Sequence, residues 1–190
     1  MHLILASSSP RRAELLRQIG LSFTVIPSCL NEGEPVFPLT KWVEGLSLAK
    51  ARAVQAKKSE IVLAADTIVH IDGRVLGKPD SIPQAREMLR SLSGRKHQVI
   101  TGICIIYDDK IYQDFAVTDV YFRELKNCEI DAYSASGEPL DKAGAYGIQG
   151  MGSLLVERID GCYYNVMGLP LTKTMNLLRK CGVMILGKDK

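Results

Sequence analysis

A segment rich in serine and arginine follows the first apolar run of the chain, and its pattern suits anion binding. It reads Ser-Ser-Ser-Pro-Arg-Arg over residues 7–12. Ser9 is a good N-cap for a helix that begins at Pro10. Arg11 and Arg12 would then oppose the positive end of the helix dipole. A bound phosphate removes that conflict, because backbone N–H groups, hydroxyls and guanidinium groups all bind anions. The alternative is a solvated first turn.

Asp66 is the one charge in a long apolar run from Ile61 to Ile71. A carboxylate in that setting is unfavourable unless it is paired, binds a metal or lies at an exposed strand end. The sequence Asp72-Gly73 predicts a two-residue hairpin, which sets Thr67 opposite Lys78. Lys78 then lies near Asp66, and a bulge would bring the two side chains to one face. The alternative is a purely structural salt bridge.

Glu32 and Lys50 are candidates only in combination with Asp66. Glu32 lies in a loop rich in Pro and Glu, residues 27–39. Together with Asp66 it offers a carboxylate pair of the kind that Mg²⁺ uses when it also binds substrate phosphates. Lys50 falls in a predicted helix, where a lysine is more often a surface charge.

A glycine-rich loop near residues 143–150 is the fourth candidate. Its glycines would let the backbone approach a ligand closely. Gln149 carries both a donor and an acceptor and so suits the edge of a base. The alternative is a tight connection before a strand expected at Ser153.

The elements that position these residues mix β-α-β units with hairpins. Hydrophobic periodicity predicts helices near 10–19, 41–57, 84–92, 126–135 and 170–179, and strands near 3–6, 23–26, 61–71, 74–76, 99–107 and 111–122. A second hairpin is expected at Asp160-Gly161. We therefore expect a single α/β domain over residues 1–190, with a mixed twisted sheet and flanking helices.

Composition narrows the class of protein. Apolar residues make up 46% of the 190 residues and charged residues 24%, as in an ordinary globular protein. A net charge of +3 is too small for a dedicated nucleic-acid binder. The five cysteines form no C-x-x-C pair, which argues against zinc or disulfides and favours a reducing compartment. We see no signal peptide and no run long enough to span a membrane, so a cytoplasmic location is expected.

Taken together, these segments resemble the Maf family of nucleotide pyrophosphatases over nearly the whole chain. The matching segments, in order, are Ser9-Pro10-Arg11-Arg12, Glu32, Leu48–Ala51, Ala65–Thr67, Gly77–Pro79, Leu92–Gly94 and Asp141–Gly150. The resemblance implies a Maf or ITPase-like mixed α/β fold with a central cleft, often as a homodimer. It also implies a metal-dependent hydrolase that cleaves between the α- and β-phosphates of a nucleoside triphosphate.

The resemblance assigns roles by matched position. Asp66 is the proton acceptor, and Glu32 with Asp66 would hold Mg²⁺ or Mn²⁺. The positions linked to base preference are Arg11, Thr67 and Gln149. The polar cleft would contain Arg12, Glu32, Lys50 and Lys78, and Ser9 is a further candidate for substrate binding.

The version Gly-Ala-Tyr-Gly-Ile-Gln-Gly at 144–150 looks like the branch acting on dTTP and UTP, with modified pyrimidine nucleotides as further candidates. One departure is Asn31, where many members carry an acidic residue, and it bears on metal affinity. The competing hypothesis is a non-catalytic nucleotide-binding regulator of septation. The combination of Asp66, Glu32 and Lys78 favours turnover, since binding alone needs no buried carboxylate facing an anion.

Overall fold

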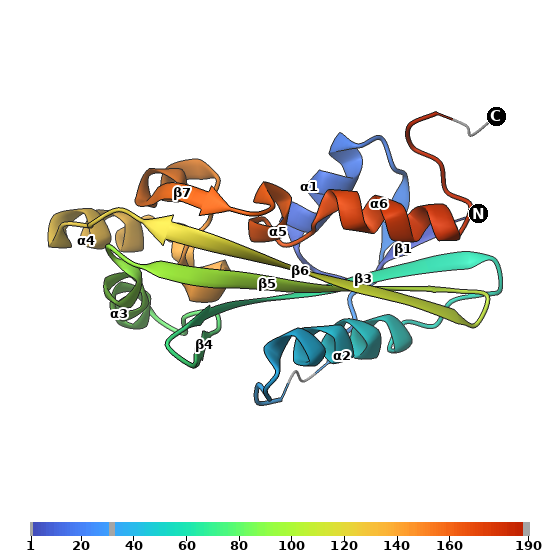
Figure 1. The fold of residues 1–190 in the computed structure, drawn as a ribbon, viewed down its shortest axis with the longest axis horizontal. Helices are drawn as coiled ribbons and strands as arrows, with labels where there is room; N and C mark the ends of the chain where they lie inside the picture. Colours follow the sequence, from blue (N-terminus) through green and yellow to red (C-terminus); the bar gives the residue numbers. More distant parts are fainter. Residues whose placement is uncertain (1, 31–32, 188–190) are drawn as a thin grey trace. The chain divides into compact units, whose positions relative to one another are not determined.

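The fold is a mixed sheet with helices packed against it, and the computed structural model describes residues 2–30 and 33–187 (Figure 1). The strands are β1 (His2–Leu5), β2 (Phe23–Val25), β3 (Glu60–Ile71), β4 (Arg74–Leu76), β5 (Lys96–Tyr107), β6 (Lys110–Phe122) and β7 (Val156–Asp160). The helices are α1 (Pro10–Gln18), α2 (Leu39–Arg52), α3 (Ile82–Leu92), α4 (Asn127–Ala135), α5 (Tyr163–Val166) and α6 (Leu171–Lys180). Three short 3-10 helices are η1 (Glu138–Asp141), η2 (Ala143–Ala145) and η3 (Gly150–Leu155).

The described residues form one seven-stranded sheet in the order β2-β1-β3-β5-β6-β7, with β4 paired to β3. β1 runs parallel to both β2 and β3, whereas the β3–β4 and β6–β7 pairs are antiparallel. The expected mixed α/β sheet with flanking helices is therefore confirmed.

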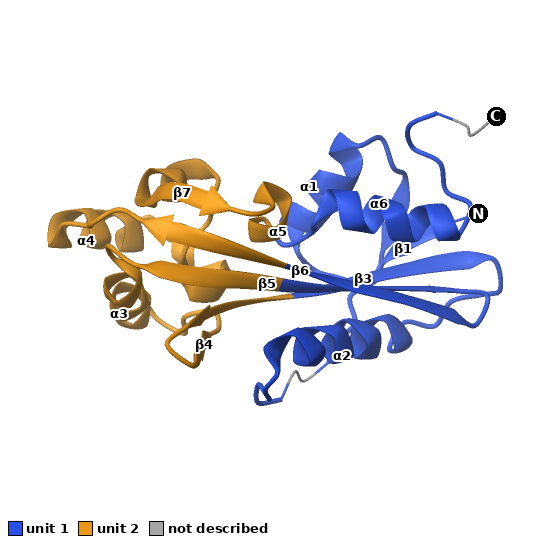
Figure 2. Cartoon of the chain, in the orientation of Figure 1, with its two compact units in different colours: residues 1–66, 101–116, 168–190 blue, residues 67–100, 117–167 orange. Residues whose placement is uncertain are grey.

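Contacts within the chain group into two compact units (Figure 2). Unit 1 comprises residues 1–66, 101–116 and 168–190, and unit 2 comprises residues 67–100 and 117–167. The division passes through β3, β5 and β6, because each of these long strands contributes residues to both units.

In unit 1 both faces of the sheet are covered, with α2 on one side and α1 and α6 on the other (Figure 1). Alternate residues of a strand point to opposite faces. Ile4, Val62 and Ala64 accordingly pack in one cluster with Ala51 of α2. A strand buried on both faces reads as a continuous apolar run, which explains the long run in β3.

In unit 2 the core lies between the sheet and the helices α3 and α4. Ala85, Leu89 and Leu92 are fully buried and form one stripe of α3. Three rings pack edge to face in the core next to this stripe of α3, those of His97, Phe122 and Tyr146. His97 Nε2 lies 2.7 Å from the Tyr146 hydroxyl. Burial lowers the pKa of His97 to about 4, so the ring is neutral at physiological pH. The cluster is therefore an uncharged part of the core.

The first predicted hairpin is confirmed in its register. Ile71 pairs with Arg74 across the Asp72-Gly73 turn, and both turn residues have positive φ, as the Asp-Gly signal requires. The ladder ends at the pairing of Val69 with Leu76. The expected alignment of Thr67 with Lys78 therefore lies beyond the paired residues.

The second predicted hairpin, at Asp160-Gly161, is wrong. β7 ends at Asp160, opposite Asp119 of β6, and the chain then enters α5 instead of turning back as a strand. A Cβ at Gly161 would lie 2.8 Å from the Thr118 hydroxyl oxygen, which also accepts the Cys162 N–H at 3.0 Å. Gly161 is needed because the backbone here lies close to Thr118 of β6. The resulting Asp-Gly pair looks the same in the sequence as the Asp-Gly pair of a hairpin turn.

Two element boundaries also differ from expectation. α2 ends at Arg52 rather than near residue 57, because the Val54 N–H bonds to the Ala51 carbonyl and its side chain turns into the core. The strand expected at Ser153 begins at Val156, since the preceding residues form η3.

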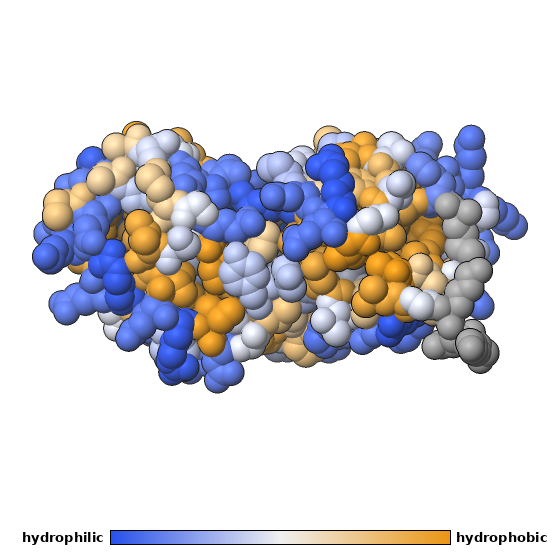
Figure 3. All heavy atoms as spheres, turned by 90° about the horizontal axis from the view of Figure 1, so that it is seen from above, coloured by the Kyte–Doolittle hydropathy of each residue, from blue (hydrophilic) through white to orange (hydrophobic). Residues whose placement is uncertain are grey.

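The surface carries both hydrophobic and hydrophilic side chains, which are interspersed over each unit in the face that Figure 3 presents. No helix among the described residues is long and apolar enough to cross a bilayer. All five cysteines lie in the described ranges and are free thiols, and burial raises the pKa of Cys104 to about 12.

The contact between β5 and α2 can be tested at Gly102. A Cβ at this buried position would lie 2.3 Å from the Val43 carbonyl oxygen, a backbone atom that cannot rotate away. We expect Gly102→Ala to lower the free energy of unfolding by about 1–3 kcal/mol. Gly45, on the exposed side of α2 with no atom within 4 Å of its Cβ position, is the matched control. Gly45→Ala should raise stability by about 0.5–1 kcal/mol. Urea unfolding curves measure both, and equal effects would contradict this packing.

Candidate active site

Asp66 and Lys50 form a buried ion pair in unit 1. Lys50 Nζ lies 2.5 Å from Asp66 Oδ1, and the side chains are 11% and 6% exposed. Asp66 is the last residue of β3 that belongs to this unit. It follows the alternation of Val62 and Ala64, so it faces α2, from which Lys50 extends. The Asp66 carboxylate, which would be unfavourable alone in the apolar run, is therefore paired with a lysine of α2.

Lys50 reaches this place because it lies on the buried stripe of α2. Val43, Ser47, Lys50 and Ala51 are the buried residues of successive turns. The alternative that Lys50 is a surface charge is therefore wrong, and the helical spacing of the buried residues indicates its burial.

The second carboxylate oxygen of Asp66 takes no part in the ion pair with Lys50. Asp66 Oδ2 is buried and has no hydrogen-bond partner among the described residues. A buried polar atom without a partner is uncommon and calls for an explanation such as a ligand, an ion or water. An anionic oxygen is a suitable ligand for a hard divalent cation. This atom fits both a metal ligand and a proton acceptor.

The segment after β1 is organised by a buried arginine. Arg12 Nε donates to the Gly168 carbonyl at 2.8 Å, and its Nη1 donates to the Ser7 hydroxyl at 2.9 Å. The same hydroxyl accepts the Ser9 N–H at 3.3 Å. Arg12 is 9% exposed, so it is not part of a solvated first turn. Its guanidinium instead fixes the loop before α1 against the start of the segment that leads to α6.

The remaining residues predicted on this segment occupy the expected positions. Ser9 is the N-cap of α1 and Pro10 its first residue, although the Ser9 side chain makes no capping hydrogen bond within the described residues. Arg11 is half-buried in the first turn. Ser7 was not singled out from the sequence, because the position before Pro10 favoured Ser9 among the three consecutive serines.

In unit 2 the glycine-rich loop packs against the β3–β4 hairpin. The Gly144 N–H donates to the Gly77 carbonyl at 3.0 Å, and a Cβ at Gly144 would lie 3.0 Å from the Val69 side chain. Gly77 directly precedes Lys78, which is exposed. Two segments predicted separately are thus adjacent. Thr67, also in unit 2, is half-buried on β3.

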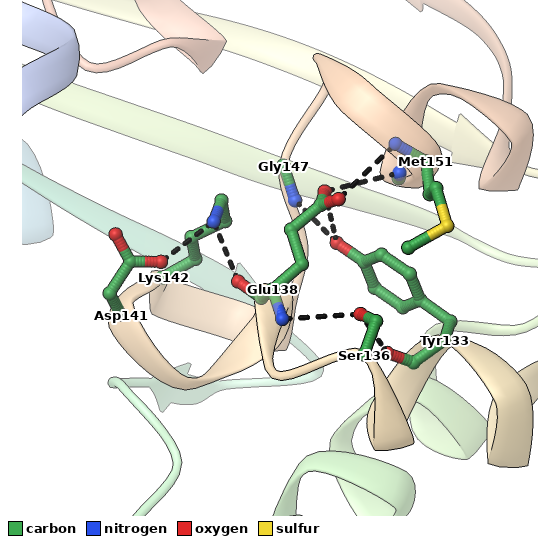
Figure 4. A network of polar contacts seen from close by, with 8 residues as sticks. Tyr133, Ser136, Glu138, Asp141, Lys142, Gly147 and Met151 are labelled. Carbon is green, nitrogen blue, oxygen red and sulfur yellow. Dashed lines mark hydrogen bonds and ion pairs between the residues drawn. The ribbon is translucent and has the colours of Figure 1, made fainter.

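Gln149 lies in the turn that joins η2 to η3, and its side chain is half-buried. The turn is linked by hydrogen bonds to Tyr133 and Glu138, which sequence reasoning did not select (Figure 4). No pattern in the sequence indicated them, since both lie before the recognisable motif.

Comparison with known proteins gives a consistent result. The model of the family described as "Maf-like protein" matches residues 2–181. The chain belongs to the Maf family. A relative from Moorella thermoacetica, named dTTP/UTP pyrophosphatase, is 52% identical over 98% of both chains. One of the same name from Clostridium perfringens is 50% identical over 98% of this chain and all of its own length. The solved structure of a HAM1 protein from Coxiella burnetii shares 16% identity, covers 64% of this chain and 73% of its own, and has a TM-score of 0.46.

Two carboxylates are predicted to hold the metal, and Asp66 is the one that lies within the described ranges. Glu32, predicted as a metal ligand beside Asp66, and Asn31 lie outside the described residues. Among the residues that are described, no group of three or more His, Cys, Asp or Glu side chains is arranged to hold a metal. Asp66 Oδ2 is the atom that fits such a role in unit 1.

Because the Lys50–Asp66 pair is buried, we expect two lysines of α2 to contribute unequally to stability. Lys50→Met would leave the Asp66 carboxylate buried without its counter-charge, so we expect the free energy of unfolding to fall by about 3–5 kcal/mol. Lys41 pairs with Glu44 at 2.9 Å on the same helix, but its side chain is 74% exposed. Lys41→Met should therefore change stability by only about 0–1 kcal/mol. Denaturant unfolding of both variants checks this, and similar values for the two would show that the Lys50 pair is not buried.

Proposed function

We propose that this protein hydrolyses dTTP and UTP to the nucleoside monophosphate and pyrophosphate. The observation that carries the proposal is the buried Asp66, with one oxygen paired to Lys50 and the other without a partner, in a member of the Maf family. Relatives about half identical over nearly their full length are named dTTP/UTP pyrophosphatase, which supports the choice of substrate.

In the proposed reaction a water oxygen attacks the α-phosphorus. The bond between that phosphorus and the oxygen bridging to the β-phosphate breaks, and pyrophosphate leaves with the bonding electrons. Asp66 Oδ2 accepts the proton of the water, as a positioned general base. Lys50 holds the carboxylate through Oδ1, so its orientation does not depend on the substrate. Arg12 and Lys78 offset the charge that develops on pyrophosphate.

A divalent cation, Mg²⁺ or Mn²⁺, completes the proposal. Asp66 and Glu32 are the residues that would hold it. When bound, such an ion supplies charge neutralisation and polarisation of the phosphate oxygens. The unpartnered anionic oxygen of Asp66 supports this assignment.

Base selection is assigned to Gln149, with Arg11 and Thr67 as further contributors and Ser9 at the phosphates. The Gln149 amide can donate to the O4 oxygen of uracil or thymine and accept from its N3–H group. Cytosine presents an amino donor and a ring acceptor at those two places, which reverses the pattern. The amide therefore distinguishes the two kinds of pyrimidine only where its orientation is fixed, because a flipped amide would match cytosine.

A cytoplasmic location and a homodimer remain predictions. A non-catalytic regulator of septation would bind the nucleotide without releasing pyrophosphate, and the experiment on Asp66 separates this alternative from turnover.

Asp66→Asn tests the proton acceptor. The amide keeps the shape but accepts no proton, so we expect kcat for pyrophosphate release from dTTP and UTP, measured with Mg²⁺ or Mn²⁺, to fall by about 10²–10⁴-fold. Binding of dTTP, measured by calorimetry, should persist. Asp72→Asn, in the exposed turn of the same hairpin, is the matched control and should retain full activity. Full turnover in Asp66→Asn would refute the mechanism, and binding without turnover in the unmodified protein would favour the regulator.

Gln149→Glu tests base selection. A carboxylate cannot donate to O4, but it accepts from the cytosine amino group. The kcat/KM for dTTP and UTP should fall about tenfold or more relative to that for CTP. Gln55→Glu makes the same charge change at an exposed loop residue and should leave the ranking of the three nucleotides unchanged. An unchanged ranking in Gln149→Glu would remove Gln149 from the base site.

A further inference from the structure

The turn from Gly147 to Gly152 is held at its first residue by a tyrosine from α4. The Tyr133 hydroxyl accepts the Gly147 N–H at 3.2 Å and donates to Glu138 Oε1 at 3.0 Å (Figure 4). All of these residues belong to unit 2. One phenol group therefore connects the start of the turn that contains Gln149 to a carboxylate on η1.

The same carboxylate holds the other end of the turn. Glu138 Oε1 accepts the Gly152 N–H at 3.2 Å, and Oε2 accepts the Met151 N–H at 3.2 Å. These N–H groups belong to the first turn of η3, where backbone donors lack partners inside the helix. Hydrogen bonds from backbone N–H to an ionised acceptor are stronger than neutral ones. Gln149 thus lies between two anchored stretches of backbone.

The glycines of the turn allow it to close tightly around these two side chains. A Cβ at Gly152 would lie 2.1 Å from the Gly147 carbonyl oxygen and 2.6 Å from the Tyr133 hydroxyl. Gly150 has a φ of +62°, and a Cβ there would lie 3.0 Å from Glu138 Oε2. The backbone of the turn is therefore in close contact with Tyr133 and Glu138 at these points.

The anchors are themselves fixed. Tyr133 is 5% exposed, and burial raises its pKa, so the phenol stays protonated and remains a donor. The Glu138 N–H donates to the Ser136 hydroxyl at 3.2 Å, and the Glu138 carbonyl accepts from Lys142 Nζ at 2.6 Å. Lys142 Nζ also lies 2.7 Å from Asp141 Oδ1. The carboxylate therefore has a defined position before any ligand binds.

We propose that Tyr133 and Glu138 are positioning residues that set the orientation of Gln149 and thereby the choice of base. The inference rests on the proposed function, because it takes Gln149 as the residue that contacts the base. Both side chains act through the backbone of the turn. Their removal should alter discrimination among pyrimidines and leave the cleavage step, which is assigned to Asp66, nearly intact.

The experiment compares steady-state kcat and KM for dTTP, UTP and CTP in Tyr133→Phe, Glu138→Gln, Gln149→Ala and the double variant of Glu138→Gln with Gln149→Ala. In each single variant we expect the ratio of kcat/KM for dTTP over CTP to fall about tenfold, the factor for one lost hydrogen bond. In the Tyr133 and Glu138 variants, the kcat at saturating dTTP should stay within about twofold. The double variant should match Gln149→Ala, because Glu138 acts only through Gln149.

Tyr146→Phe is the matched control. It also removes a buried hydroxyl from the same core cluster, but that hydroxyl bonds to His97 rather than to the turn. Thermal unfolding should show a loss of stability for both tyrosine variants, whereas only Tyr133→Phe should alter the ratio for the two bases. Glu138→Asp, which keeps the charge but withdraws it by one methylene, provides a second variant if Glu138→Gln folds poorly and should lower the ratio in the same way.

The outcomes separate this inference from the function on which it rests. If Gln149→Ala keeps the discrimination of the unmodified enzyme, both the base-reading role and this inference are overturned. If Gln149→Ala loses discrimination but the Tyr133 and Glu138 variants keep it, the positioning role alone is overturned. Additive losses in the double variant would also overturn it, because they would mean that Glu138 acts independently of Gln149.

Discussion

The ion pair of Lys50 and Asp66 lies inside an apolar layer, between α2 and β3, and it constrains both elements. Separating two charges that are nearly excluded from water would leave each without compensation, so α2 is held at a fixed rotation on the sheet. Ala51 and Ala64, small residues beside the pair, let the helix approach closely enough for a 2.5 Å contact. The Asp66 carboxylate, which alone would destabilise an apolar strand, is thus paired and oriented. Its second oxygen is buried and has no hydrogen-bond partner among the described residues.

Two further polar side chains bind backbone groups elsewhere in the chain, the buried Arg12 and the half-buried Glu138. Arg12 bonds to the carbonyl of Gly168, and Glu138 bonds to the N–H groups of Met151 and Gly152. Backbone groups make suitable anchors because they cannot rotate away as side chains do. In unit 1 this fixes the loop before α1, and in unit 2 it fixes the turn that carries Gln149.

The sequence predicted most of the helices and strands, because burial of one or both faces of an element produces a regular pattern of apolar residues. The long strands β3, β5 and β6, the β3–β4 hairpin and the helices α1, α2, α3, α4 and α6 follow from that pattern, whereas the short helix α5 was not predicted. The hairpin at Asp160-Gly161 failed because a glycine needed for contact with Thr118 looks the same as one needed for a turn. Lys50 was predicted as a site residue only through the family resemblance, because a lysine on a helix is more often exposed, whereas its place on the buried stripe of α2 shows that it is not.

The sequence predicted Asp66 and Gln149 as candidate site residues, but not Tyr133 and Glu138. Asp66 and Gln149 occupy places where an unusual residue type interrupts a local pattern, so the sequence reveals them. Tyr133 and Glu138 interrupt nothing, since a tyrosine on a helix and a glutamate at a helix start are ordinary. Their role arises only when the chain folds back and brings the turn onto them. Residues that position a site through backbone contacts are therefore visible in three dimensions and not in the order of the chain.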